Sequence, residues 1–176
     1  MIRRINIFAG PGAGKSTLAA DIFVHLKQNH ILIELVTEYI KDWVYLNMAP
    51  KSFDQIYIFA KQLHKEDVLL RSDDKPCIVT DSPLMMQLAY MDALPYRKEV
   101  IGLCNMFEQK YPSLNIFLDR NDTPYQRNGR YSDYQQAKEL DLKIENNLKD
   151  HSQAYAKFSN KQTQDIFSFI KNEINE

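Results

Sequence analysis

A glycine-rich loop between an apolar strand and a helix is the feature of this chain that most limits its fold. The apolar residues 5–8 indicate a strand, and residues 9–14 read Ala-Gly-Pro-Gly-Ala-Gly. A helix is predicted over 15–28, because Leu18, Ile22 and Leu26 recur at a spacing of four. This order of strand, loop and helix is the context in which a glycine loop can wrap a phosphate group.

The loop and the first helical turn match the phosphate-loop pattern G-x-x-x-x-G-K-[ST], except that Ala9 takes the place of the first glycine. Glycines let backbone N–H groups turn inward toward phosphate oxygens, and the helix N-terminus adds its dipole. Lys15 is expected to reach the β- and γ-phosphates, and Ser16 to offer its hydroxyl to Mg²⁺. The residues expected to bind ATP are Gly10, Gly12, Ala13, Gly14, Lys15, Ser16 and Thr17.

The rest of the chain alternates strand-like and helix-like segments, as in a parallel sheet with helices on both faces. Strands are expected at 5–8, 31–36, 77–80 and 114–118, with a weaker fifth near 155–158; helices are expected at 15–28, 40–46, 96–110, a stretch that includes 137–148, and from Ser52 and Thr163 onward. We therefore expect an α/β fold with about five parallel strands, in a single domain over residues 1–176.

Composition narrows the classes of function. The net charge is −1 and the pI about 6.4, so binding of nucleic acid through bulk charge is not favoured. Cys77 and Cys104 are too few for a disulfide framework and are expected to be buried. No apolar stretch approaches 18 residues, and the N-terminus lacks the features of a signal peptide. We therefore expect no membrane contact and a cytoplasmic protein.

Two acids follow predicted strands, at the sheet edge where parallel sheets bind ligands. Asp81 ends the buried strand 77–80 and is expected to hold Mg²⁺, directly or through water; a helix cap is the alternative. Glu38 ends the second strand and could accept the proton of a hydroxyl that attacks the γ-phosphate, although a helix cap or a surface acid would also fit.

The polar segment from about 121 to 132 carries arginines on both sides of Gly129. Arg127 and Arg130 are expected to act as a lid that stabilises charge on the transferred phosphoryl group; a solvated loop is the alternative. A second cluster, of aromatic residues, follows the second strand, and Trp43 and Tyr57 are the candidates for stacking against a base. A role in the core is equally expected for such aromatics.

On these motifs the chain resembles the P-loop kinases of nucleosides and nucleotides over nearly its whole length, which implies the P-loop kinase fold. Residues 37–43, Thr-Glu-Tyr-Ile-Lys-Asp-Trp, resemble a segment of deoxynucleoside kinases that holds the general base and a tryptophan of the base pocket. Residues 53–57 resemble the helix whose glutamine binds a pyrimidine. The resemblance implies that Glu38, Trp43 and Gln55 form the acceptor site.

One departure from that family concerns the acceptor's phosphate. Those kinases usually carry an arginine directly after the acid that ends the third strand, whereas Asp81 is followed here by Ser82 and Pro83. The change weakens a monophosphate-kinase interpretation and leaves Arg120 as a candidate substitute.

The opening 8–11 and the helix 55–63 also resemble phage kinases that phosphorylate the hydroxyl of 5-hydroxymethyluracil in DNA. The resemblance implies ATP and Mg²⁺, a pyrimidine-type acceptor, and the host cytoplasm. The alternatives are a kinase of free deoxynucleosides or their monophosphates, and a P-loop ATPase or switch that acts on a partner protein. The sequence fixes neither the acceptor nor the oligomeric state.

Overall fold

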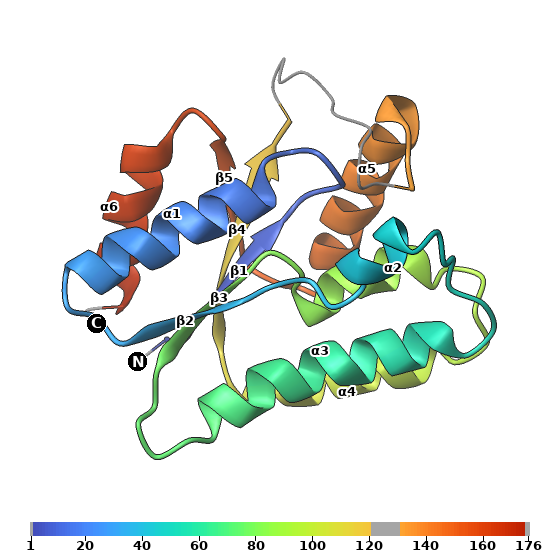
Figure 1. Ribbon diagram of the computed structural model, residues 1–176, viewed down its shortest axis with the longest axis horizontal. Coiled ribbons are helices and arrows are strands. Elements are labelled where there is room, and N and C mark those ends of the chain that lie inside the picture. The colour runs from blue at the N-terminus through green and yellow to red at the C-terminus, as the bar shows by residue number, and fades with distance from the viewer. Residues whose placement is uncertain (1, 121–130, 175–176) are drawn as a thin grey trace.

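A single sheet of five parallel strands forms the centre of the protein (Figure 1). The structure is a computed structural model that describes residues 2–120 and 131–174. The strands are β1 (Arg4–Phe8), β2 (Ile33–Val36), β3 (Cys77–Thr80), β4 (Ser113–Asp119) and β5 (Ala156–Ser159), and their order across the sheet is β2-β3-β1-β4-β5. The expected α/β fold with a parallel sheet of about five strands is confirmed.

Helices cover both faces of this sheet (Figure 1). Helices α1 (Lys15–Gln28) and α6 (Thr163–Ile174) pack on one face. The other face is covered by α3 (Asp54–Leu70), the 3₁₀ helix η1 (Leu84–Tyr90), α4 (Arg97–Lys110) and α5 (Tyr134–Asp150), while α2 (Lys41–Tyr45) is short. None of the helices within 2–120 and 131–174 is long and apolar enough to cross a bilayer.

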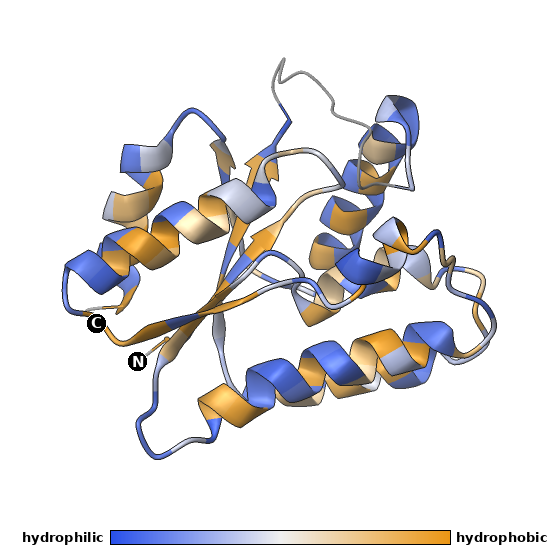
Figure 2. Ribbon diagram, viewed as in Figure 1, coloured by the Kyte–Doolittle hydropathy of each residue, from blue (hydrophilic) through white to orange (hydrophobic). Residues whose placement is uncertain are grey.

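Alternate residues of each strand enter the two halves of the core, because successive side chains of a strand point to opposite faces. In β1, Ile5 and Ile7 pack toward α1 and α6, whereas Phe8 packs toward the other helices. In β4, Ile116 and Phe117 divide in the same way. Figure 2 shows the apolar residues concentrated on the strands. Because helices cover both faces of the sheet, side chains on both sides of each strand are buried, and the strands appear in the sequence as apolar runs.

Two local expectations differ from the structure. A helix was expected from Ser52 onward, but the φ of Ser52 is 48° and helix α3 begins at Asp54. The Asp54 carboxylate accepts a hydrogen bond from the backbone N–H of Lys51, 2.8 Å away. The segment Leu84–Tyr90, for which no element was expected, forms a 3₁₀ helix whose buried residues join the core. Its three-residue repeat does not produce the spacing of four used to find helices.

The strand order places the glycine loop at the switch point of the sheet. Strand β1 lies in the middle, between β3 and β4, and its carboxyl end leads directly into the loop. The chain runs from β1 to β2 and β3 on one side of β1, and then crosses to β4 and β5 on the other side. Ligands of open parallel sheets bind at this point, beyond the carboxyl ends of the strands.

At the opposite end of β1 an arginine is buried among carboxylates. Arg4 is 2% exposed, and its Nε lies 3.3 Å from Glu66 of α3 while its Nη1 lies 2.9 Å from Glu108 of α4. Burial raises the pKa of Glu66 to about 6, although the Arg4 guanidinium opposes this change. The two ion pairs of Arg4 therefore link α3 and α4 to the sheet, and they do so with a desolvated carboxylate at Glu66.

This raised pKa predicts a dependence of stability on pH. The folded state retains a proton on Glu66 up to about pH 6, whereas the ordinary pKa is 4.5. Stability from this group is therefore fully present below pH 4.5 and is lost as pH rises through about 6, a change of about 2 kcal/mol. Relative to wild type, Glu66→Gln is expected to be more stable at pH 7 than at pH 4.5 by that amount, measured by urea unfolding. The partly exposed acid Glu34, changed to Gln, is the control, and an equal difference at both pH values would contradict the prediction.

Candidate nucleotide and acceptor site

The glycine loop adopts the backbone conformation that its sequence predicts. Gly12 and Gly14 have φ angles of 78° and 98°, in the left-handed region that glycine adopts without strain. Gly14 precedes the first turn of α1, and Lys15 donates a hydrogen bond of 3.0 Å from Nζ to the carbonyl of Gly10. The helix N-terminus and a lysine thus meet at one loop, which is the arrangement that binds phosphate.

Asp81 connects this loop to the end of β2. Its Oδ2 accepts a hydrogen bond from the hydroxyl of Ser16, and its Oδ1 accepts one from the backbone N–H of Glu38, 3.1 Å away. A hydroxyl and a carboxylate side by side are oxygen ligands suited to Mg²⁺, which takes few protein ligands and completes its shell with phosphates and water. The residues fit the expected Mg²⁺ site of Ser16 and Asp81, and this role stays a prediction.

Burial shifts the pKa values of the two charged residues at this junction, Lys15 and Glu38. Burial lowers the pKa of Lys15, while Glu38, Asp81 and Asp141 oppose the change. Burial raises the pKa of Glu38, and the positive charges of Lys15 and Lys41 oppose it. Burial thus disfavours the charged form of both side chains, and a ligand of complementary charge would relieve this cost; such pKa shifts are common in functional sites.

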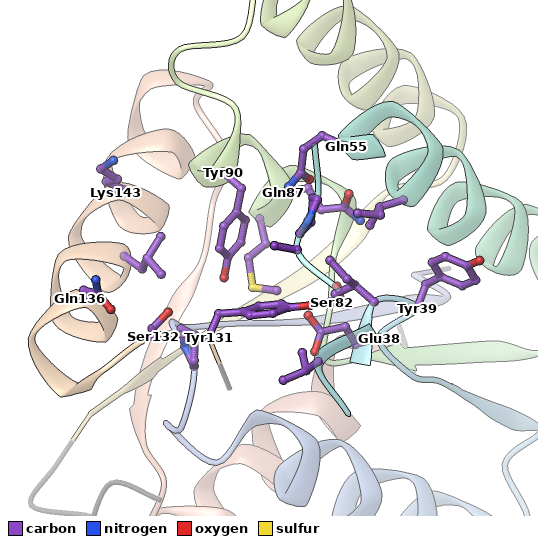
Figure 3. Close-up of a pocket in the computed structure, with 18 of the residues that line it drawn as sticks. Glu38, Tyr39, Gln55, Ser82, Gln87, Tyr90, Tyr131, Ser132, Gln136 and Lys143 are labelled. Atoms are coloured by element: carbon purple, nitrogen blue, oxygen red, sulfur yellow. The ribbon is translucent and has the colours of Figure 1, made fainter. Parts of the chain in front are cut away.

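A cavity of about 540 Å³ opens beside Glu38 (Figure 3). This volume is within the range of small-molecule sites, and the lining is mainly apolar with a few polar groups. Pro11 of the glycine loop forms part of its wall, so the phosphate loop and the cavity are adjacent. The polar and aromatic residues of the lining that matter most are Glu38, Gln55, Ser82, Gln87, Tyr90 and Tyr131.

Three amide side chains line this cavity, Gln55, Gln87 and Gln136 of α5, and the first two bear most directly on an acceptor. Gln55 lies in the first turn of α3 and lines the cavity, and it is the glutamine that the sequence predicted to bind the acceptor (Figure 3). Gln87 of η1 also lines it, is 5% exposed, and has a buried Oε1 with no hydrogen-bond partner among the described residues. Sequence reasoning missed Gln87. Its one signal was that it is the only polar residue in the otherwise apolar and aromatic run 84–90.

Tyr131 lies at the edge of the cavity near Glu38 (Figure 3). Its hydroxyl donates to the carbonyl of Met48, and burial together with the Glu38 charge raises its pKa. The residue comes from the end of the expected lid, for which only arginines were considered. It joins the segment before α5 to the segment after α2, on two sides of the cavity.

The two aromatic candidates lie elsewhere. Trp43 and Tyr57 stack on each other with ring centroids 6.4 Å apart, and neither belongs to the cavity lining. The hydroxyls of Tyr57 and Tyr39 are hydrogen-bonded at 2.9 Å, and Tyr39 does line the cavity. The structure therefore puts Trp43 and Tyr57 behind Tyr39, outside the cavity, and their proposed contact with a base stays a prediction.

The expected arginines have different positions. Arg120 follows β4 but does not line the cavity: its guanidinium is paired with Asp141 of α5 and donates to the carbonyl of Pro11. Arg127 and Arg130 lie outside the described residues, as does most of the expected lid over 121–132. Of the acceptor-site candidates, Glu38 and Gln55 thus meet at one cavity, and Arg120 lies against the phosphate loop.

Comparisons with known proteins agree with this architecture. The solved structure described as NadR protein in complex with NR aligns with a TM-score of 0.69 at 14% identity. The alignment covers 89% of this chain and 45% of the NadR chain, so this chain spans less than half of that protein. A search of curated proteins gives no significant match. Among protein families, the AAA domain matches residues 4–165. With its phosphate loop at the switch point of a parallel sheet, the chain belongs to this AAA domain family and has a P-loop fold.

Proposed function

We propose that this protein is a kinase that transfers the γ-phosphate of ATP to a hydroxyl group of a pyrimidine-type acceptor. One observation carries the proposal: Glu38 lines a ligand-sized cavity, and its backbone is hydrogen-bonded to the same Asp81 that contacts Ser16 of the phosphate loop. A carboxylate in a cavity and a phosphate site thus share one residue. Direct transfer requires the two bound molecules to lie next to each other, and this connection supports such an arrangement.

In the proposed reaction the acceptor hydroxyl oxygen forms a bond to the γ-phosphorus, and the bond from that phosphorus to the β,γ-bridging oxygen breaks, which releases ADP. The carboxylate of Glu38 takes the hydroxyl proton. Lys15 holds charge on the phosphates, and Arg127 and Arg130 are expected to do so from the lid. Mg²⁺, held by Ser16 and Asp81, would neutralise phosphate charge when bound.

The lining of the cavity supports a pyrimidine-type acceptor. Gln55 and Gln87 each offer a carbonyl oxygen and an NH₂ group, which together can bind the alternating donors and acceptors on the edge of a base. The buried Oε1 of Gln87 has no partner among the described residues, and a ligand donor would satisfy it. The NadR structure is described as a complex with NR, so a protein of similar fold binds that ligand.

The best candidate acceptor is 5-hydroxymethyluracil in DNA of a phage. Beside Tyr39, a wall residue, the outer surface carries exposed aromatic and basic groups: Lys61 lies 5.4 Å from the Tyr57 ring and Lys65 lies 5.9 Å from the Tyr39 ring. Aromatic and cationic groups together suit a nucleic-acid strand. A base in a duplex would have to be flipped out to enter the cavity, as in other enzymes that modify bases.

A transfer screen tests the proposal. Purified protein with radiolabelled ATP and Mg²⁺ is offered DNA containing 5-hydroxymethyluracil, the same DNA with thymine, free deoxynucleosides and deoxynucleoside monophosphates. We expect label in the hydroxymethyluracil DNA and none in the thymine control, because only the former has the hydroxyl. Label in nucleosides alone would move the acceptor to the free nucleoside. Label in monophosphates alone would replace the hydroxyl-kinase proposal by a monophosphate kinase.

ATP hydrolysis without any transfer would favour the remaining alternative, a P-loop ATPase or switch acting on a partner protein. The AAA domain match is compatible with that class. Glu38 and the amide-lined cavity would then have no role, because a switch needs neither an acceptor base nor a pocket for a small acceptor.

A further inference from the structure

Arg120 and Asp141 form a buried ion pair against the phosphate loop. The Nε of Arg120 lies 2.7 Å from Oδ2 of Asp141, and their side chains are 5% and 16% exposed. The same guanidinium donates a hydrogen bond of 2.7 Å to the carbonyl of Pro11. The Oδ1 of Asp141 accepts a hydrogen bond from the backbone N–H of Gly10. The pair therefore contacts two consecutive residues of the loop from outside the acceptor cavity.

Helix α5 approaches the loop closely enough to depend on a glycine there. A Cβ atom at Gly10 would lie 2.5 Å from the backbone carbonyl of Ala137 and 2.8 Å from Oδ1 of Asp141. The first contact is with backbone, which cannot move aside as a flexible side chain can. The first turns of α5 are thus packed on the start of the phosphate loop, and Asp141 extends this contact by one helical turn.

Three partners fix the loop at this point. Asp141 holds the N–H of Gly10, Lys15 holds its carbonyl at 3.0 Å, and Arg120 holds the next carbonyl. A glycine-rich loop loses more conformational entropy on ordering than other segments do, because glycine has the most backbone freedom. Hydrogen bonds to charged groups are stronger than those between neutral groups. Contacts that hold the loop in one shape reduce the cost of ordering it when it binds phosphate.

We propose that Arg120 and Asp141 are positioning residues that hold the phosphate loop in its nucleotide-binding shape and in register with α5. On another face, α5 presents Gln136, Leu140 and Lys143 to the acceptor cavity. The ion pair therefore also fixes the nucleotide site relative to the acceptor site. This inference rests on the proposed function for the identity of ATP, and its test is made by nucleotide binding without acceptor.

The test measures the dissociation constant of ATP with Mg²⁺ by calorimetry, together with the melting temperature of each variant. Asp141→Ala is expected to raise the dissociation constant about tenfold or more, which corresponds to about 1.4 kcal/mol. Asp141→Asn should have a smaller effect, because its amide oxygen can still accept from Gly10 while the charge is lost. The Arg120→Ala and Asp141→Ala double variant should be no worse than the more severe single variant, since the two residues act as one unit.

The exposed ion pair between Lys27 and Glu34, with Nζ and Oε1 3.0 Å apart, provides the matched control. Glu34→Ala is expected to leave ATP affinity unchanged. An unchanged dissociation constant in a folded Asp141→Ala variant, or a lowered melting temperature with unchanged affinity, would overturn the inference and assign the pair to stability alone. If Asp141→Ala does not fold, Asp141→Asn and Arg120→Lys provide the same comparison. Wild-type protein that binds ATP but phosphorylates no acceptor would sink the proposed function and leave this inference standing.

Discussion

Replacement of Lys15 by alanine is expected to lower kcat/KM for phosphoryl transfer by about a thousandfold. The ammonium group lies at the start of α1, where its Nζ is 3.0 Å from the Gly10 carbonyl, and burial lowers its pKa without the compensation that phosphate oxygens would supply. In the transition state, charge builds on the oxygens around the transferred phosphorus. A preorganised cation there is worth far more than one in water, because the site is partly desolvated.

The fold should survive this change, since Lys15 is only half-buried and the helix N-terminus and the glycine backbone remain. Steady-state rates with ATP and the acceptor found in the screen measure the effect, and circular dichroism checks the fold. Lys171→Ala, at an exposed lysine of α6 on the other face of the sheet, is the control and should retain turnover to within a few-fold. Turnover near the wild-type rate in Lys15→Ala would remove the assignment of the phosphate loop to catalysis.

The sequence was sufficient for the parts of the fold and site that depend on local patterns. Buried parallel strands are visible as apolar runs, so β3 was expected at 77–80 and is found there. The loop was visible because strand, glycines and lysine follow one another within a dozen residues. The positions of Glu38 and Asp81 followed from strand ends, because carboxyl ends of parallel strands share one edge of the sheet.

Features that depend on distant segments were out of reach. Arg120 was expected near the acceptor, but its ion pair with Asp141 of α5 holds it against the phosphate loop instead. In the sequence, Asp141 is one of several polar residues of that helix and nothing marks it as a partner of Arg120. One signal was available: Asp141 lies four residues after Ala137, among the positions that face the core in α5. Gln87 was hidden because a 3₁₀ helix does not show the periodicity of an α-helix. Trp43 and Tyr57 were candidates because aromatic residues cluster after the second strand, but neither belongs to the cavity wall.

Glu38→Gln is expected to lower transfer to a hydroxyl acceptor by about a hundredfold, while ATP affinity stays near the wild-type value. A hydroxyl is a poor nucleophile until its proton can leave, and a positioned carboxylate contributes on the order of 10²–10⁴-fold by accepting that proton. Glutamine keeps the shape of the side chain and its hydrogen-bonding ability but cannot take the proton. The backbone N–H of residue 38 still donates to Asp81, so the Ser16 contact is not disturbed. The comparison uses steady-state rates of both proteins with the hydroxyl acceptor found in the screen.

The pH profile separates a base from a merely structural carboxylate. Burial raises the pKa of Glu38 above its ordinary value of 4.5. A general base works only when deprotonated, so the wild-type rate should fall as pH decreases through this raised pKa and recover as pH increases. This decrease in rate at low pH, the acid limb of the profile, should be missing from Glu38→Gln. Any decrease that comes from protonation of ATP itself should remain in both proteins. A phosphate acceptor is already ionised and needs no base, so Glu38→Gln should lose little with a monophosphate if one is accepted. A wild-type rate with a hydroxyl acceptor, or an unchanged acid limb in Glu38→Gln, would show that the proton goes elsewhere.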